Sequence, residues 1–599
     1  MEQLKPRSEI DTKYKWDLTA IYQNETEVLK ALKEVEKQTK MLLSYQGKIM
    51  QDSATLYEFY QLHDQLSCLL EKVGIYVLLY LDEDTTNADA QSLKMKVMHV
   101  LERVGEQTSF IGPEMLKTPF SVVEEYIKEN ANLETYRFDL EKIYRFQKYT
   151  LTEKEEEIIS MASGALATPD EVFTHLDNTD IHYGNIIDAN GIEVELTNEN
   201  YSVYIESKDR NVRKNAFETL YHYWESIKNT VAATLKGQIK ATLFQSKVHH
   251  YESSLEASLY DDNISLSVYH NLIDTVHKNL DKMYDFMAFK KRILGLDELH
   301  MYDIYVDLVK EDHKTYSYEE AKTIILEALK PLGETYVSDL KKGLENGWVD
   351  VYPTKNKKSG AYCTASYGTH PYVLLNYYGT IGSVSTAAHE LGHAMHYYYS
   401  IKHQPSVYYS YPIFSAEIAS TVNEVLLNEY MYQHAESKNE KIVILTKFLS
   451  NIRSTIYRQT MFAEFEMLMH EKEAKGIPLT EKEFSSTYYE LNRLYYGENV
   501  VSDDLIRYEW ERIPHFYSPF YVYKYATGLS AALAIATKIL AGDAGVRDKY
   551  IQFLSSGDSN YPLELLKEVG VDMTTPAPIE DALHLFDTKL QELKALCEV

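Results

Sequence analysis

Two histidines and one glutamate near the middle of the chain have the residue types and spacing needed to hold a metal ion beside a base. They are His389, Glu390 and His393, which form an H-E-x-x-H motif within an apolar segment. Residues i and i+4 lie on one face of a helix, so both imidazoles can reach the same ion while the carboxylate lies beside the pair. About one chain in twenty of this length would contain such a motif by chance. A third ligand is therefore needed to distinguish a metal site from a chance match.

The third ligand distinguishes one class of metal enzyme from another. A catalytic zinc uses three protein ligands and leaves a fourth position open for water. The metzincin pattern would place a histidine at position 399, where this chain has Tyr399, so that class is excluded. A glutamate on a second helix is the other common solution, and Glu417 meets it. Glu424, about two turns further along the same face, can accept a hydrogen bond from a ligand imidazole as an outer-shell partner.

Helices are predicted for most of the chain, with β structure at two places. Apolar residues at helical spacing run from Val28 to Leu42 after the N-capping residue Asn24, and similar stripes recur along the chain. Asn190-Gly191 is a hairpin turn signal within residues 181–196, and the apolar run 371–376 predicts a strand. The polar, glycine-bearing stretch 355–368 is expected to be a mobile loop. The chain is therefore predicted to be mostly α.

The composition is that of a folded protein and excludes several classes of partner. Hydrophobic residues make up 45% of the chain, an ordinary globular value, and 599 residues exceed the size of one core, so two or three lobes are expected. A net charge of -29 would repel phosphate backbones, so nucleic acid is not an expected partner. Three cysteines without a C-x-x-C pair argue against disulfides and thiolate metal sites. With no signal segment or membrane-spanning stretch, we expect a cytoplasmic protein without membrane contact.

The two metal-ligand segments resemble those of one family of zinc peptidases. H-E-L-G-H at 389–393 followed by F-S-A-E-I-A-S-T-V-N-E at 414–424 is similar to the thimet oligopeptidase family, and most similar to its oligoendopeptidase F branch. The resemblance covers most of the chain. It also includes Trp16-Asp-Leu18, the segment 207–213, the run 371–376 and the stretch 515–528.

The resemblance implies a fold, a division of the chain and a substrate class. The implied fold is a mostly α, multi-lobed zincin fold with a small β-sheet beside the active site, enclosing a deep channel that admits short, unfolded oligopeptides. The chain would divide into an N-terminal helical region at 1–110, a small oligopeptidase N-terminal lobe at 111–198 and the zinc metallopeptidase catalytic region at 199–599. A peptide would lie against the strand Tyr372 to Leu375 through backbone hydrogen bonds.

The resemblance implies a zinc-dependent endopeptidase with one ion per chain, and the residue types supply its mechanism. Zinc lowers the pKa of its bound water and polarises the peptide carbonyl, and Glu390 takes the water proton and passes it to the leaving amine. The tetrahedral oxyanion needs further donors, for which the candidates are His515, Tyr517, Tyr523 and Tyr525. The chain has 51 tyrosines, so simple packing is an equal alternative for each of these candidates.

Two other interpretations stay open at this point. A non-catalytic helical scaffold with a vestigial motif predicts the loss of a ligand or of the base. The chain has all four of these residues, namely His389, Glu390, His393 and Glu417. An exopeptidase would keep the zinc and add a residue that captures a peptide terminus, which one sequence does not identify. His396 is expected to be structural, since a fourth protein ligand would close the open position. The cleavage preference, the substrate length limit, the oligomeric state and the choice of zinc over cobalt or manganese are left open.

Overall fold

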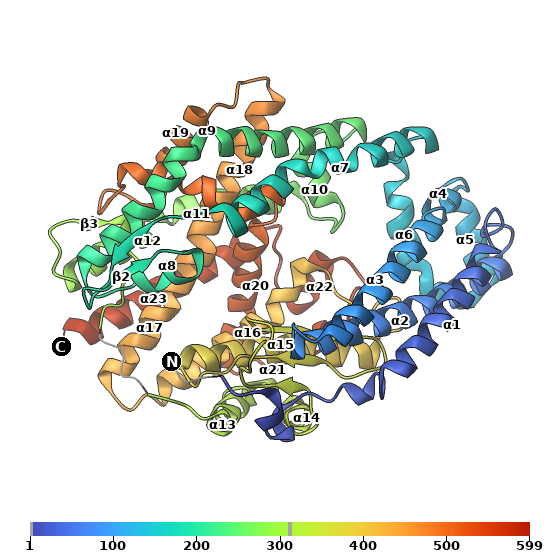
Figure 1. Cartoon of the computed structure of the whole chain (residues 1–599), viewed down its shortest axis with the longest axis horizontal. Helices are drawn as coiled ribbons and strands as arrows, with labels where there is room; N and C mark the ends of the chain where they lie inside the picture. Colours follow the sequence, from blue (N-terminus) through green and yellow to red (C-terminus); the bar gives the residue numbers. More distant parts are fainter. Residues whose placement is uncertain (1–3, 310–313, 599) are drawn as a thin grey trace. The chain divides into compact units, whose positions relative to one another are not determined.

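The protein is described by a computed structural model that covers residues 4–309 and 314–598. Within these ranges helices predominate, and the β structure consists of seven strands of two or three residues each (Figure 1). This confirms the mostly α fold. The chain forms two compact units, each assembled from three separate segments. The first unit comprises 1–150, 313–427 and 535–570, and the second comprises 151–312, 428–534 and 571–599. The division at 1–110, 111–198 and 199–599 stays a prediction.

The first unit begins with three long helices, α1 (Glu25–Leu43), α2 (Ser53–Glu83) and α3 (Ala88–Thr108), which pack against one another. The side chain of Asn24 accepts from the backbone N–H of Glu27 at 3.3 Å, and the apolar stripe of α1 is buried. The predicted capped helix is thereby confirmed. The other helices lying wholly in this unit are α4 (Ile111–Leu116), α5 (Phe120–Glu129), α6 (Arg137–Arg145), α13 (Tyr318–Ala328), α14 (Glu334–Glu345), α15 (Ile381–His403), α21 (Ala544–Leu554) and α22 (Pro562–Val569).

A three-stranded sheet in the first unit packs on the helix that carries H-E-x-x-H. Its strand order is β4 (Val349–Asp350), β6 (Tyr372–Leu374), β5 (Tyr362–Thr364), with β4 parallel and β5 antiparallel to β6. The strand predicted within 371–376 is confirmed. The mobile loop predicted over 355–368 is wrong in part, because β5 lies inside it and pairs with β6. Strand β6 has neighbours on both sides, so the edge strands of this sheet are β4 and β5, and neither is the strand expected to receive a peptide.

The second unit is built on long packed helices and one hairpin. Helix α9 (Arg210–Val248) packs on α7 (Glu153–His175), and α17 (Lys438–Ile452) packs on α23 (Ala577–Glu598). Strands β1 (Asn185–Ile187) and β2 (Glu193–Glu195) form the hairpin predicted at Asn190-Gly191. The other α-helices and strands lying wholly in this unit are α8 (Asn198–Ile205), α10 (Ser254–Tyr260), α11 (Leu266–Lys278), α12 (Leu280–Ile293), β3 (Leu299–His300), α18 (Arg458–Ala474), α19 (Glu481–Tyr496) and β7 (Val500–Val501). Two short helices, η10 (Asp504–Arg512) and η11 (Pro514–Tyr517), precede α20 (Tyr523–Leu540). Helices α16 (Ile413–Gln433) and α20 each contain a boundary between the segments of the two units.

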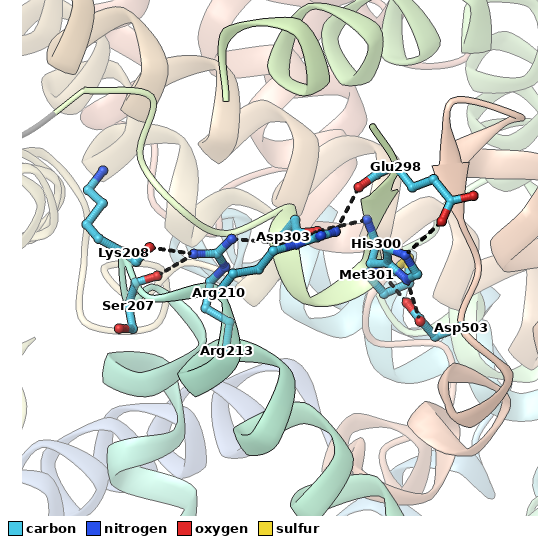
Figure 2. Close-up of polar contacts among 9 residues, drawn as sticks. All are labelled: Ser207, Lys208, Arg210, Arg213, Glu298, His300, Met301, Asp303 and Asp503. Carbon is cyan, nitrogen blue, oxygen red and sulfur yellow. Dashed lines mark hydrogen bonds and ion pairs between the residues drawn. The ribbon is translucent and has the colours of Figure 1, made fainter. Parts of the chain in front are cut away.

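A buried ion-pair network fixes the start of α9 within the second unit (Figure 2). Arg213 and Arg210 donate to the two carboxylate oxygens of Asp303 at 2.6 and 2.9 Å. Burial opposes ionisation of Asp303, but the two guanidinium groups outweigh it and lower its pKa. On the other side of Asp303, His300 Nδ1 lies 2.7 Å from Asp503 Oδ1. The segment 207–213, noted in the sequence only as a resemblance, thus anchors α9 to residues 300–303.

Candidate metal centre

Helices α15 and α16 carry the residues of the candidate centre. Helix α15 starts after Thr380, whose side-chain oxygen accepts from the backbone N–H of Ser383 at 3.1 Å. His389, Glu390 and His393 lie in the middle of α15, where the helix is regular and its inner face is buried. The helix predicted from the motif spacing is confirmed.

The backbones of α15 and α16 touch at Gly392. A Cβ at this position would lie 2.6 Å from Ser420 Cα and 2.7 Å from Ala419 O, so no larger residue fits without a shift of the helices. Close by, the side-chain amide of Asn423 donates to Ala388 O at 3.1 Å in a buried environment. This close crossing brings the glutamates of α16 to the histidines of α15.

Gly392→Ala is expected to push the two helices apart and to weaken the centre. Overpacking of this kind costs about 1–3 kcal/mol, and here the obstructing atoms are backbone atoms that cannot rotate away. We expect a lower melting temperature and a lower metal content after purification. Gly382→Ala is the matched control on the same helix, because its Cβ would meet only Thr380 Oγ1 at 3.6 Å. An alanine variant at 392 with unchanged metal content and melting temperature would contradict the close crossing.

Three donor atoms form a triangle between the helices. His389 Nε2 lies 3.2 Å from His393 Nε2 and 3.4 Å from Glu417 Oε2, and the distance from His393 Nε2 to Glu417 Oε2 is 3.6 Å. Tetrahedral zinc with bonds of 2.0–2.1 Å places its ligands about 3.3 Å apart. The three edges therefore fit a zinc ion without rearrangement. Within 4–309 and 314–598 this is the only group of three or more His, Cys, Asp or Glu donors close enough to share a metal.

Glu424 contacts the first of these candidate ligands. It accepts a short hydrogen bond from His389 Nδ1, which leaves the lone pair of Nε2 directed at the triangle. Burial disfavours the charged imidazole, but the hydrogen bond and charge of Glu424 outweigh it and raise the pKa of His389 to about 9. A metal ion would compete with that proton, because ligands bind in their deprotonated form.

Glu417 is held in its ionised form. The neighbouring imidazole of His393, 3.6 Å away, outweighs burial and lowers the pKa of Glu417 to about 2. Ser420 Oγ also donates to Glu417 Oε2, at 3.1 Å. A carboxylate that stays ionised across the ordinary pH range suits a metal ligand.

Glu390 differs from the ligands in its surroundings. Its side chain is outside the triangle and only 7% exposed, and burial raises its pKa. A carboxylate with a raised pKa next to a metal ligand is suited to accept a proton. His396 also lies outside the triangle, stacked on Tyr411 with ring centroids 3.7 Å apart. Burial lowers the pKa of His396 to about 3, so it stays neutral.

Glu424→Gln is expected to lower metal affinity by about 10- to 100-fold, the usual effect of losing an outer-shell partner. The amide is uncharged and accepts the proton of His389 Nδ1 less strongly than the carboxylate does. Competition with a fluorescent chelator would measure the affinity. Glu429→Gln, on the same helix and bonded to Lys589 instead, is the matched control. An affinity equal to that of wild type would leave Glu424 without the predicted outer-shell role.

The candidate oxyanion donors lie in the second unit, and they differ in exposure. His515 Nε2 lies 3.1 Å from the hydroxyl of Tyr525, and both side chains are partly exposed. Tyr521 stacks on His515 at 6.0 Å and meets Tyr525 edge-on at 5.4 Å. Tyr521 was not among the residues predicted from the sequence, and it lies in the loop just before α20. Burial and the charge of Arg458 lower the pKa of His515, which favours its neutral form.

The other two candidates are buried. Tyr517 is 6% exposed and stacks on Phe173 with ring centroids 4.3 Å apart. Tyr523 is 1% exposed and packs on Tyr269 at 5.3 Å. Burial raises the pKa of both phenols. The structure therefore favours His515 and Tyr525 among the four predicted donors, and the role of each stays a prediction.

Comparison with known proteins identifies the family. A profile described as "Peptidase family M3" matches residues 203–585, and one described as "Oligopeptidase F" matches residues 114–183. The chain belongs to peptidase family M3. It is a metalloendopeptidase, which excludes the scaffold interpretation. Relatives named oligoendopeptidase F are matched over 95–99% of this chain.

Three relatives document this likeness. Oligopeptidase PepF of Bacillus subtilis is 41% identical, with 99% of this chain and 89% of the relative covered. A solved structure from Chlamydophila abortus is 40% identical, has a TM-score of 0.93, and is matched over 99% of this chain and 100% of its own. The oligoendopeptidase F structure from Enterococcus faecium is 34% identical with a TM-score of 0.76, over 96% and 99% of the two chains.

Among residues 4–309 and 314–598, no helix is both long and apolar enough to cross a membrane.

Proposed function

We propose that this chain is a zinc-dependent endopeptidase that hydrolyses internal bonds of short, unfolded oligopeptides. The observation that carries the proposal is the triangle of His389 Nε2, His393 Nε2 and Glu417 Oε2, whose edges of 3.2–3.6 Å fit one tetrahedral ion. Family membership supplies the peptide as substrate class, and the relatives named oligopeptidase and oligoendopeptidase favour short substrates and internal cleavage. The enclosed channel and the cytoplasmic location stay predictions from the sequence.

The chemistry is divided between the metal and Glu390. When bound, zinc would supply a Lewis acid that lowers the pKa of a water molecule and polarises the peptide carbonyl. Glu390 takes the proton of that water and later gives it to the leaving amine. Its burial supports the first step, because a carboxylate with a raised pKa accepts a proton more readily than an exposed one.

The peptide backbone is proposed to pair with the free edge of β5. Strand β5 packs on α15, and its outer edge has no strand partner among the described residues. Main-chain hydrogen bonds to such an edge hold a peptide without selecting its side chains. This replaces β6, whose two edges are occupied. The pairing explains binding of extended chains, since a folded protein has few strands free to pair.

Removal of an oxyanion donor should lower kcat by roughly 10²- to 10³-fold and change KM less, because the charge exists only in the transition state. We expect this loss for His515→Ala and Tyr525→Phe, whose polar atoms lie 3.1 Å apart on a partly exposed surface. Tyr517→Phe and Tyr523→Phe serve as comparisons, since both phenols are buried. Metal content and melting temperature are recorded for each variant. If all four variants keep the wild-type kcat, or if kcat falls only where the melting temperature falls too, these residues have a packing role and not a catalytic one.

The direct test of the proposed function is digestion of an internally quenched oligopeptide before and after chelation. We expect activity to disappear with the chelator and to return with zinc, and we would compare cobalt and manganese at equal free concentration. Mass analysis of the products separates internal cleavage from stepwise loss of terminal residues. A folded protein with exposed loops should survive the same treatment. Activity that resists chelation, or products shortened one residue at a time, would overturn the proposal.

A further inference from the structure

A single aromatic residue between the candidate oxyanion donors has an unusual backbone. Phe520 lies in the loop 518–522, which joins η11 to α20, and its φ is 54°. This is the left-handed region, where a bulky side chain is strained and glycine is preferred. Such a conformation persists only when the surrounding structure enforces it.

Glu466 on α18 supplies that enforcement. Its side chain is 3% exposed, and its Oε1 accepts from the backbone N–H of Phe520 at 2.7 Å. Its Oε2 has no hydrogen-bond partner among the described residues. Burying a carboxyl group is costly unless it is hydrogen-bonded, and this amide is the only donor that the described contacts offer it. Burial raises the pKa of Glu466 well above its usual value, which favours its neutral form.

The ring of Phe520 is held by the same part of the unit. It packs on His470 with ring centroids 4.6 Å apart and meets Tyr269 edge-on at 6.0 Å. His470 lies one turn after Glu466 and its Nδ1 is 2.9 Å from the backbone oxygen of Glu466. Tyr269 in turn donates to Ala463 O at 2.7 Å. Backbone and ring are therefore both fixed to α18 and its immediate neighbours.

The turn at Phe520 lies between two of the candidate donors in the chain. His515 precedes it and Tyr525 follows it, and their side chains meet at 3.1 Å across the loop. We propose that Glu466 is a positioning residue that holds the left-handed turn at Phe520 and thereby sets His515 and Tyr525 for the reaction. The catalytic consequence rests on the proposed function, whereas the state of the turn can be measured without it.

Two substitutions of Glu466 distinguish the effect of its hydrogen-bond acceptor from the effect of its side-chain volume. Glu466→Gln keeps an acceptor oxygen for the Phe520 amide, and its kcat should stay within about threefold of wild type. Glu466→Leu removes the acceptor and should lower kcat by about 10²-fold, the cost of displacing a reacting group by about 1 Å, while KM changes less. Equal losses in both variants, or a wild-type kcat for the leucine variant, would overturn the proposal.

Glycine at 520 provides a rescue that a purely structural role would not show. Glycine adopts positive φ without strain, so the turn no longer needs Glu466. The double variant E466L/F520G should recover at least about tenfold in kcat over E466L alone. If kcat does not recover while metal content and melting temperature are preserved, the turn at Phe520 does not connect Glu466 to the candidate donors. Glu464→Leu is the matched control on α18, because it loses contacts to Tyr495 and His277 that do not touch the loop, and its kcat should not change.

Hydrogen exchange tests the turn even if peptides prove not to be substrates. In the wild-type chain the amide of Phe520 should exchange slowly, which needs no variant to measure. In Glu466→Leu, a peptide covering 516–524 should exchange at least about tenfold faster than in wild type, while in Glu466→Gln it should stay protected. Rapid exchange in wild type, or equal protection in all three proteins, would show that Glu466 does not hold the turn at Phe520, whatever the activity of the variants.

Discussion

Glu390→Gln is expected to retain its metal and to lose about 10²- to 10⁴-fold in kcat, the contribution of a positioned general base. The amide has nearly the same shape as the carboxylate but cannot accept a proton from water. Metal should remain, because the three donor atoms of the triangle belong to other residues. The variant therefore separates chemistry from metal binding.

The measurement combines kcat on a quenched peptide with metal analysis of the same preparation. Glu429→Gln makes the same chemical change outside the centre and should keep full activity. Near-normal turnover in Glu390→Gln would remove the residue from the mechanism. Loss of metal together with activity would show instead that it takes part in metal binding.

Glu417→Ala is expected to lose both metal and activity. It leaves two imidazoles, which are too few for a catalytic zinc site, and it removes the only negative donor of the triangle. The fall in metal affinity should exceed the roughly 10- to 100-fold change expected for an outer-shell partner such as Glu424. His389→Ala and His393→Ala should behave in the same way.

Metal content after dialysis against a weak chelator measures the effect. Ser420→Ala is a graded control, because it removes the hydrogen bonds of Ser420 Oγ to Glu417 Oε2 at 3.1 Å and to Glu417 O at 2.9 Å and leaves the ligand in place. Its metal content should stay close to wild type. Full zinc occupancy in purified Glu417→Ala would mean that the third ligand lies elsewhere in the chain.

Features set by near neighbours along the chain were predictable from the sequence. The capped helix α1 after Asn24, the hairpin at Asn190-Gly191 and the helix that carries H-E-x-x-H all appear as expected. Each depends on contacts within a few residues, such as a cap, a tight turn or the i to i+4 spacing of a helix. The candidate ligands could be named for the same reason, since their residue types and spacing already limit the chemistry.

Features set by distant neighbours were not predictable from the sequence alone. Strand β5 lies in a polar stretch whose composition indicates a loop, and only pairing with β6 makes it a strand. The left-handed turn at Phe520 has no local signal, because the acceptor that stabilises it lies on another helix. The sequence contains Gly392 but does not state that a second helix touches it there.

The sequence by itself determined which residues could hold the metal and which could act as the base, because those properties belong to side-chain chemistry and short-range spacing. Only the tertiary structure decided that three donor atoms stand 3.2–3.6 Å apart and that Glu424 fixes one imidazole. It also decided that β5, the strand that packs most on α15, lies at an edge of the sheet, and that the side chains of His515 and Tyr525 are partly exposed. These outcomes depend on close packing between segments far apart in the chain, which no local pattern encodes.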